Sequence, residues 1–401
     1  MVKISPHRIP TRRRRIGVAL IHYAIRIPHL LLWILTLGFA RKRRFPDTVR
    51  KVLLFRADGL GDVIMTLPAI SVLRDLWPDA ELTLLAGSPT NLLLPHLPNV
   101  DRAILLDLPW AQRSVEGMDW GEVRRVLREI RHEKFDLIID FRGDFRNVFL
   151  MRRMGASYRI GCGGGGCGYL LDWEIPVGES RHDVDHKLDA ARAIGARVET
   201  SKVSADTDVR FDLVTRDEDW NSIRESFPDL EPGGFVVLHP GAQWPGRQWT
   251  VAGYAGVADR IVRELGLAVV ITGAGREKAV SEAVAERMEE TPVNLVDKAS
   301  FSEFLALLSR ARLFLGVDSG PMHMAVALKV PVVALFGAGD PSAIGPWGPG
   351  SVVVSETSGF DCSPCAQTVC PHEGRSCMDA ISIDRVWQAV RQQLRAGIEE
   401  P

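Results

Sequence analysis

Residues 313–328 have the sequence LFLGVDSGPMHMAVAL, and the predicted fold is built around this segment. Its opening apolar run predicts a buried strand, after which Gly316 lets the chain turn. Asp318 or Ser319 can cap a following helix, and Pro321 suits the first turn of that helix. The stretch therefore predicts a strand, a polar loop and a helix in immediate succession.

Residues 331–337, PVVALFG, predict a second buried strand and complete a strand–helix–strand unit. In an open parallel sheet, ligands bind at the carboxyl ends of the strands. The start of the helix offers unpaired backbone N–H groups and the positive end of the helix dipole, which together suit a phosphate. We therefore expect a phosphate-bearing ligand near residues 318–321.

The length and composition limit the domain organisation. A chain of 401 residues predicts two or three domains, at about 150 residues per domain. Apolar residues make up 46% of the chain and charged residues 25%, as in folded globular proteins. Six cysteines in a chain of this length do not indicate a disulfide-stapled secreted domain.

Charge separates the first 50 residues from the rest of the chain. They contain 12 Lys or Arg and one acid, Asp47, whereas the remainder contains 37 basic and 49 acidic residues. Basic clusters at 12–15 and 41–44 bracket an apolar segment whose uninterrupted part, 30–40, is shorter than the roughly 20 residues that a membrane span needs. We predict that residues 1–45 form an amphipathic helix on an anionic membrane surface. The alternatives are a membrane span and a helix packed on the protein itself.

A first α/β domain is predicted after this segment. An apolar strand at 51–55 leads into a glycine-rich turn, a helix at 63–76 and a strand at 81–86, which together make a βαβ unit. The turn contains Gly59 and Gly61 but lacks the third glycine of a dinucleotide fingerprint. It therefore resembles that fingerprint only loosely.

Asp62 stands where the predicted turn becomes a helix. One interpretation is an N-cap carboxylate that the helix dipole stabilises. The other is a general base at the carboxyl edge of the sheet. A dipole-stabilised aspartate is a weak base, and this conflict eases if the proton leaves only as the acceptor oxygen forms its new bond. The local pattern favours neither interpretation.

Strands and helices alternate again in the second half. An apolar strand at 234–238 precedes His239, a strand at 267–272 precedes a glycine-rich turn, and Ser302 is expected to cap a helix at 303–309. This alternation predicts a second parallel α/β domain and a terminal helix. The predicted divisions are a membrane-associating segment (1–45), a first domain (46–215), a second domain (216–381) and a C-terminal helix (382–401).

From about residue 51 to residue 387 the chain resembles glycosyltransferase family 9, the heptosyltransferase-like enzymes. The resemblance rests on the motifs at 61–63 with 67–69, 239–241, 273–277, 318–323 and 335–337. It implies the GT-B fold, of the α/β class, in which two Rossmann-like doubly wound parallel-sheet domains face each other. It also implies an inverting, metal-independent transfer of heptose from an ADP-sugar onto the growing lipopolysaccharide core.

The resemblance also implies roles for individual residues. Asp62 matches the family's proposed general base, and Glu277 matches the acid that holds the donor ribose hydroxyls. Arg247 stands where the family usually has a lysine near the phosphates, which keeps the charge and adds a fork suited to phosphate oxygens.

The donor diphosphate loop and the acceptor-side loop complete the expected site. The diphosphate loop corresponds to Asp318, Ser319, Gly320, Pro321 and Met322, with His323 close behind. The acceptor-side loop is expected to contain Gly59, Gly61 and Arg142. The alternatives are an ordinary helix cap for Asp318 and a packed core histidine for His323.

The C-terminal region carries four cysteines with His372 among them, at spacings that suit zinc or an iron–sulfur cluster. The other interpretation is packed or loop thiols, and we predict no metal. The ligand candidates are Cys362, Cys365, Cys370 and Cys377.

We therefore expect a glycosyltransferase that requires no cofactor and takes a nucleotide diphosphate sugar, with ADP-heptose as the expected donor. The expected acceptor is a lipid-linked saccharide, the expected location is peripheral on the cytoplasmic face of the bacterial inner membrane, and no nucleic-acid partner is expected. One alternative keeps the fold but uses another sugar for O-antigen, capsule or another glycan. A non-catalytic saccharide-binding protein and a metal-sensing or redox role for the tail belong to other classes.

Overall fold

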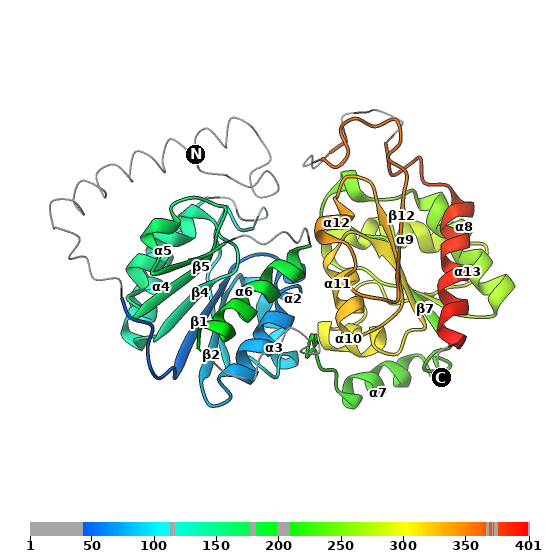
Figure 1. The fold of residues 1–401 in the computed structure, drawn as a ribbon. Helices are drawn as coiled ribbons and strands as arrows, with labels where there is room; N and C mark the ends of the chain where they lie inside the picture. The colour runs from blue at the N-terminus through cyan, green and yellow to red at the C-terminus, as the bar shows by residue number, and fades with distance from the viewer. Residues whose placement is uncertain are drawn as a thin grey trace. The chain divides into compact units, whose positions relative to one another are not determined.

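The computed structural model describes residues 43–399, apart from 113–114, 116, 177–181, 199–208, 366–368, 371 and 373–375 (Figure 1). The predicted N-terminal helix lies outside the described residues. The chain divides into two compact units, one made of Met1–Ser180 and Val184–Asp212 and the other of Arg181–Asp183 and Leu213–Pro401. Within the described part of the chain, no helix is both long enough and apolar enough to cross a bilayer.

The first unit contains a six-stranded parallel sheet in the order β3-β2-β1-β4-β5-β6. Its strands are β1 (Lys51–Arg56), β2 (Glu81–Ala86), β3 (Arg102–Leu105), β4 (Leu137–Asp140), β5 (Tyr158–Cys162) and β6 (Trp173–Ile175). The order reverses between β1 and β4, at the switch point where open α/β sheets bind ligands. Arg56 ends β1 and Asp140 ends β4, so both residues lie at this point.

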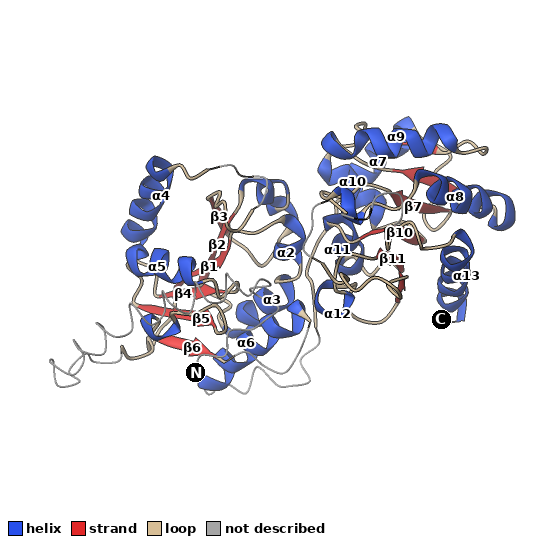
Figure 2. Cartoon of the chain, turned by 90° about the horizontal axis from the view of Figure 1, so that it is seen from above, coloured by secondary structure: helices blue, strands red, loops and turns tan. Residues whose placement is uncertain are grey.

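Helices cover both faces of this sheet, with α4 and α5 on one face and α3 and α6 on the other (Figures 1 and 2). The helices of the unit are α2 (Leu60–Ile64), α3 (Leu67–Leu76), α4 (Trp120–Glu133), α5 (Phe145–Met154) and α6 (Asp183–Arg197). A buried apolar cluster that includes Phe55, Val126 and Met151 joins the sheet to α4 and α5. This cluster anchors β1, and therefore the residues at its carboxyl end.

The helix predicted at 63–76 is two helices, α2 and α3. Pro68 is the second residue of α3, where its missing N–H costs nothing because that N–H has no intrahelical partner. The sequence also placed Gly61 and Asp62 in the turn, whereas both lie inside α2. The first helix therefore begins at Leu60, three residues earlier than predicted, and it ends at Ile64, before the proline.

The second unit repeats the same topology, in the order β12-β11-β10-β7-β8-β9, with every pairing parallel. Its strands are β7 (Phe235–His239), β8 (Ala268–Ile271), β9 (Val293–Asn294), β10 (Leu313–Val317), β11 (Val332–Phe336) and β12 (Ser351–Ser355). The order reverses between β7 and β10. Residues 313–328 thus supply the strand on one side of the switch point and the helix that follows it.

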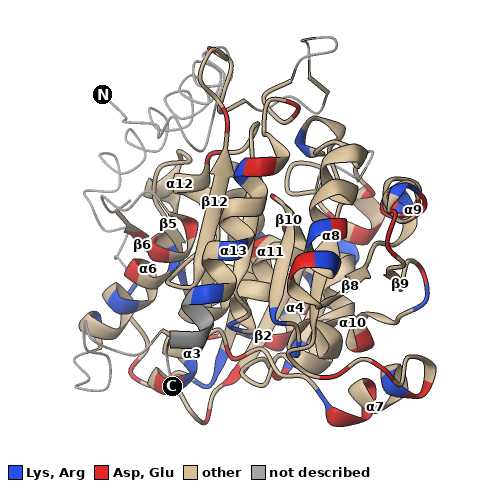
Figure 3. Cartoon of the chain, turned by 90° about the vertical axis from the view of Figure 1, so that its right-hand side faces the viewer, with Lys and Arg blue, Asp and Glu red and all other residues tan. Residues whose placement is uncertain are grey.

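The helices of this unit are α7 (Asp217–Ser226), α8 (Val251–Leu265), α9 (Lys278–Arg287), α10 (Phe301–Leu308), α11 (Gly320–Ala327), α12 (Pro341–Ile344) and α13 (Ile383–Glu399). A buried cluster that includes Leu315, Tyr254 and Trp387 joins the sheet to α8 and α13. The outer helices α7, α8 and α9 carry charges of both signs, whereas β7, β8, β10 and β11 contain no Lys, Arg, Asp or Glu (Figure 3). Strands without charge are typical of a sheet covered on both faces.

The N-terminus of α10 differs from the prediction by two residues. Ser300, not Ser302, is the N-cap, and its hydroxyl accepts a hydrogen bond from the N–H of Glu303 at 3.2 Å. The carboxylate of Glu303 accepts in turn from the N–H of Ser300 at 2.7 Å. This reciprocal pair is a capping box, and its serine-to-glutamate spacing of three residues was present in the sequence.

Candidate active site

Polar residues gather at the carboxyl ends of neighbouring strands in the second unit. His239 ends β7, Thr272 follows β8, and Asp318 and Ser319 follow β10. β7 and β10 are the strands between which the sheet order reverses. This edge therefore has the position at which doubly wound sheets bind ligands.

Helix α11 begins directly after this edge. Ser319 holds the N-cap position in an extended conformation, with φ −155° and ψ 165°, but its side chain makes no capping hydrogen bond. Its hydroxyl is buried and has no hydrogen-bond partner among the described residues. Gly320, Pro321 and Met322 form the first turn. An eight-residue helix whose first N–H groups have no side-chain cap suits an anion at this end.

Arg247, which is partly exposed, forms an ion pair with the buried Asp318 at the same edge. Nη1 of Arg247 lies 2.7 Å from Oδ2 of Asp318, whose side chain is only 5% exposed. The guanidinium lies over the ring of Trp244, 4.4 Å from the centroid, and its Nε has no hydrogen-bond partner within the described residues. The carboxylate and the ring hold the arginine, whose fork suits phosphate oxygens. The alternative that Asp318 caps the helix is wrong, because Ser319 holds the N-cap position.

His323 is the fourth residue of α11 and is 7% exposed. Its pKa is lowered to about 4, mainly by burial and also by His182 and Arg247, while Asp183 opposes the shift. The imidazole is therefore neutral near pH 7 and contributes no charge to an anion site. Its burial agrees with the alternative of a packed core histidine.

The low pKa of His323 predicts a specific loss of stability in acid. An unfolded histidine titrates near pH 6.5, so between about pH 6.5 and pH 4 the unfolded chain binds a proton that the folded chain does not. The free energy of unfolding falls as the pH drops through this window, by about 2 kcal/mol at pH 5 from this residue. Denaturant unfolding at pH 7 and pH 5 should show a smaller loss for His323→Gln than for the wild type. Equal losses would contradict the assignment.

Glu277 reaches the same edge from the loop after β8. Its Oε2 lies 3.0 Å from Nε2 of His239, and Nδ1 of His239 lies 3.0 Å from the hydroxyl of Thr272. The Glu277 side chain is 24% exposed, so it is not fully enclosed by the protein. A Cβ at Gly241 would lie 2.5 Å from Cβ of Glu277, so glycine is required beneath this side chain. The sequence-predicted donor residues therefore meet at one edge of the second sheet.

In the first unit, Asp62 is held at the switch point by two donors. Its Oδ2 accepts a hydrogen bond from the N–H of Gly59 at 3.2 Å, and its Oδ1 accepts from Nη2 of Arg56 at 3.2 Å. The N-cap of α2 is Gly59, so the interpretation of Asp62 as the N-cap is wrong. The Asp62 side chain is 43% exposed, whereas that of Arg56 is 4% exposed. This geometry presents a fixed, accessible carboxylate.

Comparison of the sequence with known proteins identifies the family of this chain. A family model described as glycosyltransferase family 9 (heptosyltransferase) matches residues 123–375. The chain belongs to glycosyltransferase family 9. The glycosyltransferase is 26% identical over 331 residues to lipopolysaccharide heptosyltransferase 1 of Pseudomonas aeruginosa, across 80% of this chain and 88% of the relative. It is 23% identical over 309 residues to lipopolysaccharide core heptosyltransferase OpsX of Haemophilus influenzae, across 76% and 83% of the two chains.

Solved structures share the fold of the glycosyltransferase. A glycosyl transferase family 9 protein of Veillonella parvula matches with a TM-score of 0.72 and 22% identity, over 86% of this chain and 98% of that chain. The ADP-heptose lipopolysaccharide heptosyltransferase II of Escherichia coli matches with a TM-score of 0.68 and 20% identity, over 87% and 99%. The predicted GT-B class, with two parallel-sheet α/β domains, is confirmed.

Arg142 of the glycosyltransferase is tied into the first unit. Its guanidinium pairs with the buried carboxylate of Asp58, and Nη2 donates to the carbonyl of Trp110 at 2.6 Å. Asp140, whose pKa burial raises, accepts hydrogen bonds from the backbone N–H groups of Arg142 and Gly143. These contacts fix the loop after β4. Arg142 therefore shapes the switch point of the first unit, where Gly59 and Gly61 also lie.

The C-terminal cysteines of the glycosyltransferase lie around one small cavity, together with His372 and Phe360. The four are Cys362, Cys365, Cys370 and Cys377. Sγ of Cys362 lies 3.5 Å from Nε2 of His372, and all four are free thiols. Among the described residues, no three His, Cys, Asp or Glu side chains are close enough together to hold a metal ion.

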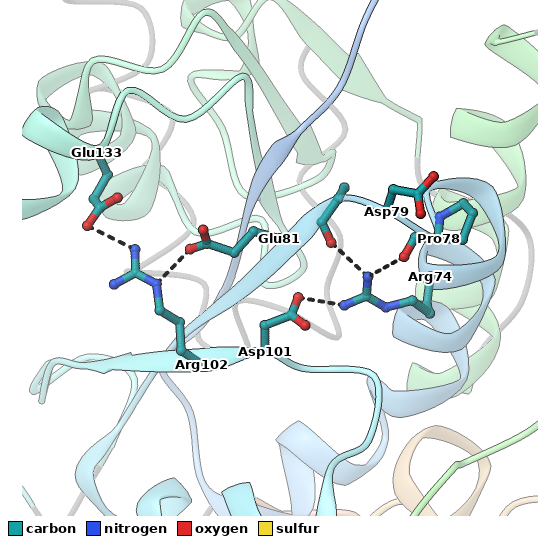
Figure 4. Close-up of a pocket in the computed structure, with 8 residues that line it drawn as sticks. Arg74, Pro78, Asp79, Glu81, Asp101, Arg102 and Glu133 are labelled. Carbon is teal, nitrogen blue, oxygen red and sulfur yellow. Dashed lines mark hydrogen bonds and ion pairs between the residues drawn. The ribbon is translucent and has the colours of Figure 1, made fainter.

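A wide surface hollow in the first unit lies away from the switch point (Figure 4). It is lined at the amino ends of β2 and β3, where Arg102 pairs with Glu81 at 2.7 Å and with Glu133 at 3.1 Å. Arg74 pairs with Asp101 at 2.6 Å in the same hollow. These charged residues of the hollow are paired with one another. The hollow also lies at the edge of the sheet opposite the ligand-binding edge, so it is not a candidate site.

Several residues at the two edges were missed as functional candidates from the sequence. They are Arg56, Asp58, His239, Trp244 and Thr272. Two features of the sequence could have identified some of them: the pattern Arg56-x-Asp58 directly after a predicted strand, and the histidine at the end of β7. Polar residues at the carboxyl end of a parallel strand are candidates for ligand binding. Their partners were not visible, because each contact depends on the loop conformation or on the pairing of neighbouring strands.

Proposed function

We propose that this glycosyltransferase moves heptose from ADP-heptose onto the lipopolysaccharide core or a similar lipid-linked saccharide, with inversion and without a catalytic metal. The observation that carries the proposal is the ion pair between Arg247 and the buried Asp318, at the edge where α11 begins without a side-chain cap. Both features favour a diphosphate. Glu277 at the same sheet edge adds a carboxylate suited to ribose hydroxyls.

The departing group supports this assignment of the second unit. When the bond between the anomeric carbon and the diphosphate oxygen breaks, the nucleoside diphosphate gains negative charge. Arg247 and the N–H groups at the start of α11 are preorganised donors for that charge. Because these groups are fixed before the reaction, little reorganisation is required at the transition state.

The attacking group supports a role for Asp62. The acceptor hydroxyl loses its proton as its oxygen bonds to the anomeric carbon, and one carboxylate suffices to take that proton. Inversion follows from a single displacement and needs no second nucleophile; inverting glycosidases follow the same opposite-face logic. The partly exposed carboxylate of Asp62, fixed by Arg56 and Gly59, fits that task.

The names of the relatives support the choice of sugar and acceptor. Both relatives compared above are lipopolysaccharide heptosyltransferases, and the Escherichia coli neighbour is named for ADP-heptose. A transfer assay with ADP-heptose and a panel of UDP-, GDP- and dTDP-sugars, with heptose-free lipopolysaccharide as acceptor, tests the proposal. We expect mass spectrometry to show the addition of one heptose from ADP-heptose alone. Transfer of another sugar would contradict the donor assignment.

We also propose that residues 1–45 hold the enzyme on the cytoplasmic face of the inner membrane, where a lipid-linked acceptor is presented. Support comes from charge, because 12 Lys or Arg and one acid lie within the first 50 residues. Each basic residue near an anionic bilayer contributes about 1 kcal/mol of attraction. The acidic remainder of the chain offers no comparable attraction.

Deletion of residues 1–44 should release the enzyme from membranes without abolishing its activity. We expect the full chain to sediment with vesicles that contain phosphatidylglycerol, and to do so less as salt increases, because screening weakens surface attraction. The truncated chain should stay in the supernatant and still transfer sugar to a soluble acceptor. Vesicles of neutral lipid serve as the control. Sedimentation of the truncated chain would rule out this anchor.

A further inference from the structure

His239 lies between the donor-site carboxylate and a buried hydroxyl. Its Nε2 is 3.0 Å from Oε2 of Glu277, and its Nδ1 is 3.0 Å from Oγ1 of Thr272. We propose that His239 is a positioning residue, whose Nε2–H fixes the carboxylate of Glu277 for the ribose hydroxyls of the donor nucleotide. This inference rests on the proposed function and assigns a further residue to it.

The hydrogen-bond network determines which nitrogen of the ring carries hydrogen. A carboxylate only accepts hydrogen bonds, so a bond to Glu277 requires hydrogen on Nε2 of His239. In the neutral ring Nδ1 then accepts, and the hydroxyl of Thr272 can donate to it at 3.0 Å. If the hydroxyl instead donates to the carbonyl of Leu238, at 3.4 Å, only a protonated ring satisfies both contacts. In either arrangement, Nε2–H donates to Glu277.

The orientation of the ring is fixed by the sheet and by aromatic neighbours. The N–H of Thr272 donates to the carbonyl of Leu238 at 3.0 Å, so the residues that flank the ring belong to paired strands. The rings of Phe314 and Phe304 lie 6.5 Å and 6.2 Å from the His239 ring. Because His239 is only 4% exposed, water competes little for its hydrogen bonds.

The arrangement leaves one oxygen of the Glu277 carboxylate, Oε1, available to a ligand. Among the described residues, none donates a hydrogen bond to Oε1 of Glu277, whereas Oε2 is held by His239. A carboxylate fixed through one oxygen meets a diol with less loss of side-chain entropy than a freely rotating one. His239 therefore acts on donor affinity through Glu277, with no contact of its own to the nucleotide.

Binding of ADP and of 2′,3′-dideoxy-ADP, measured by calorimetry on the full chain, tests this role. The wild type should bind ADP at least tenfold more tightly, because only ADP offers hydroxyls to Glu277. His239→Asn places its amide near Nδ1 and cannot reach Glu277, so ADP affinity should fall about tenfold and dideoxy-ADP affinity should not change. His239→Gln carries an N–H near the position of Nε2 and should keep most of the preference for ADP.

Two further variants separate positioning from folding. Thr272→Val removes the hydroxyl that orients the ring and should also reduce the preference for ADP, whereas Val354→Ala, at another buried position of the same unit, should not. A full wild-type preference in both His239→Asn and Thr272→Val would overturn the inference, as would an equal loss for both nucleotides. If no nucleoside diphosphate binds the wild type, the proposed function itself fails.

Discussion

Asp62→Asn should lower the rate of sugar transfer by about a thousandfold, within the range that a general base contributes. The amide oxygen can still accept from the N–H of Gly59, so the local fold is kept, but the amide cannot take up the proton of the acceptor hydroxyl. ADP affinity should stay close to that of the wild type, because the donor residues belong to the other unit. Initial rates with ADP-heptose and calorimetry with ADP measure the two quantities.

Asp144→Asn provides a matched control in the same unit. Asp144 is the N-cap of α5, where its side chain accepts from the N–H of Arg146, and asparagine caps helices equally well. We expect near wild-type transfer from this control. Near-normal turnover of Asp62→Asn would remove Asp62 as the base, whereas an equal loss in both variants would indicate a general effect of lost carboxylates.

Arg247→Met should weaken ADP binding by about a hundredfold. The variant loses charge-assisted hydrogen bonds to the diphosphate and leaves the buried negative charge of Asp318 beside the phosphate oxygens. Arg247→Lys keeps the charge without the planar fork, so its affinity should fall between those of Met and the wild type. Calorimetric titration of ADP gives these affinities directly.

The control for Arg247 is an exposed arginine of the same unit. Arg260 on α8 pairs with Asp384 at 2.8 Å on the surface, and surface pairs contribute at most about 1 kcal/mol. Arg260→Met should therefore bind ADP as the wild type does. Unchanged ADP affinity in Arg247→Met would show that the diphosphate does not bind beside this residue.

The parts of the fold that follow from local sequence were predictable. The run at 313–317 is a buried strand because five apolar or glycine residues stand together, and α11 begins after it at Gly320, with Pro321 in its first turn. The N-cap of α10, formed by Ser300 and Glu303, was not predicted correctly. The capping-box spacing was in the sequence, but a second serine nearby offered a competing cap, and only the backbone geometry decides between them.

The long-range contacts of the site were not predictable from the sequence. His239 and Glu277 are 38 positions apart and meet because β7 and β8 pair in parallel with a fixed register. Arg56 meets Asp62 because the helix starts at Leu60, three residues earlier than predicted, which makes Gly59 the cap and turns the carboxylate back toward β1. Residue types predicted the chemistry, whereas register and loop conformation determined the partners.

A crystal structure of the protein with bound ADP would place the diphosphate and the ribose directly. We predict that the diphosphate contacts Arg247 and the backbone N–H groups at the start of α11, and that the ribose hydroxyls contact Glu277. Density for ADP at another surface of the second unit, or with the ribose where the diphosphate is expected, would contradict it.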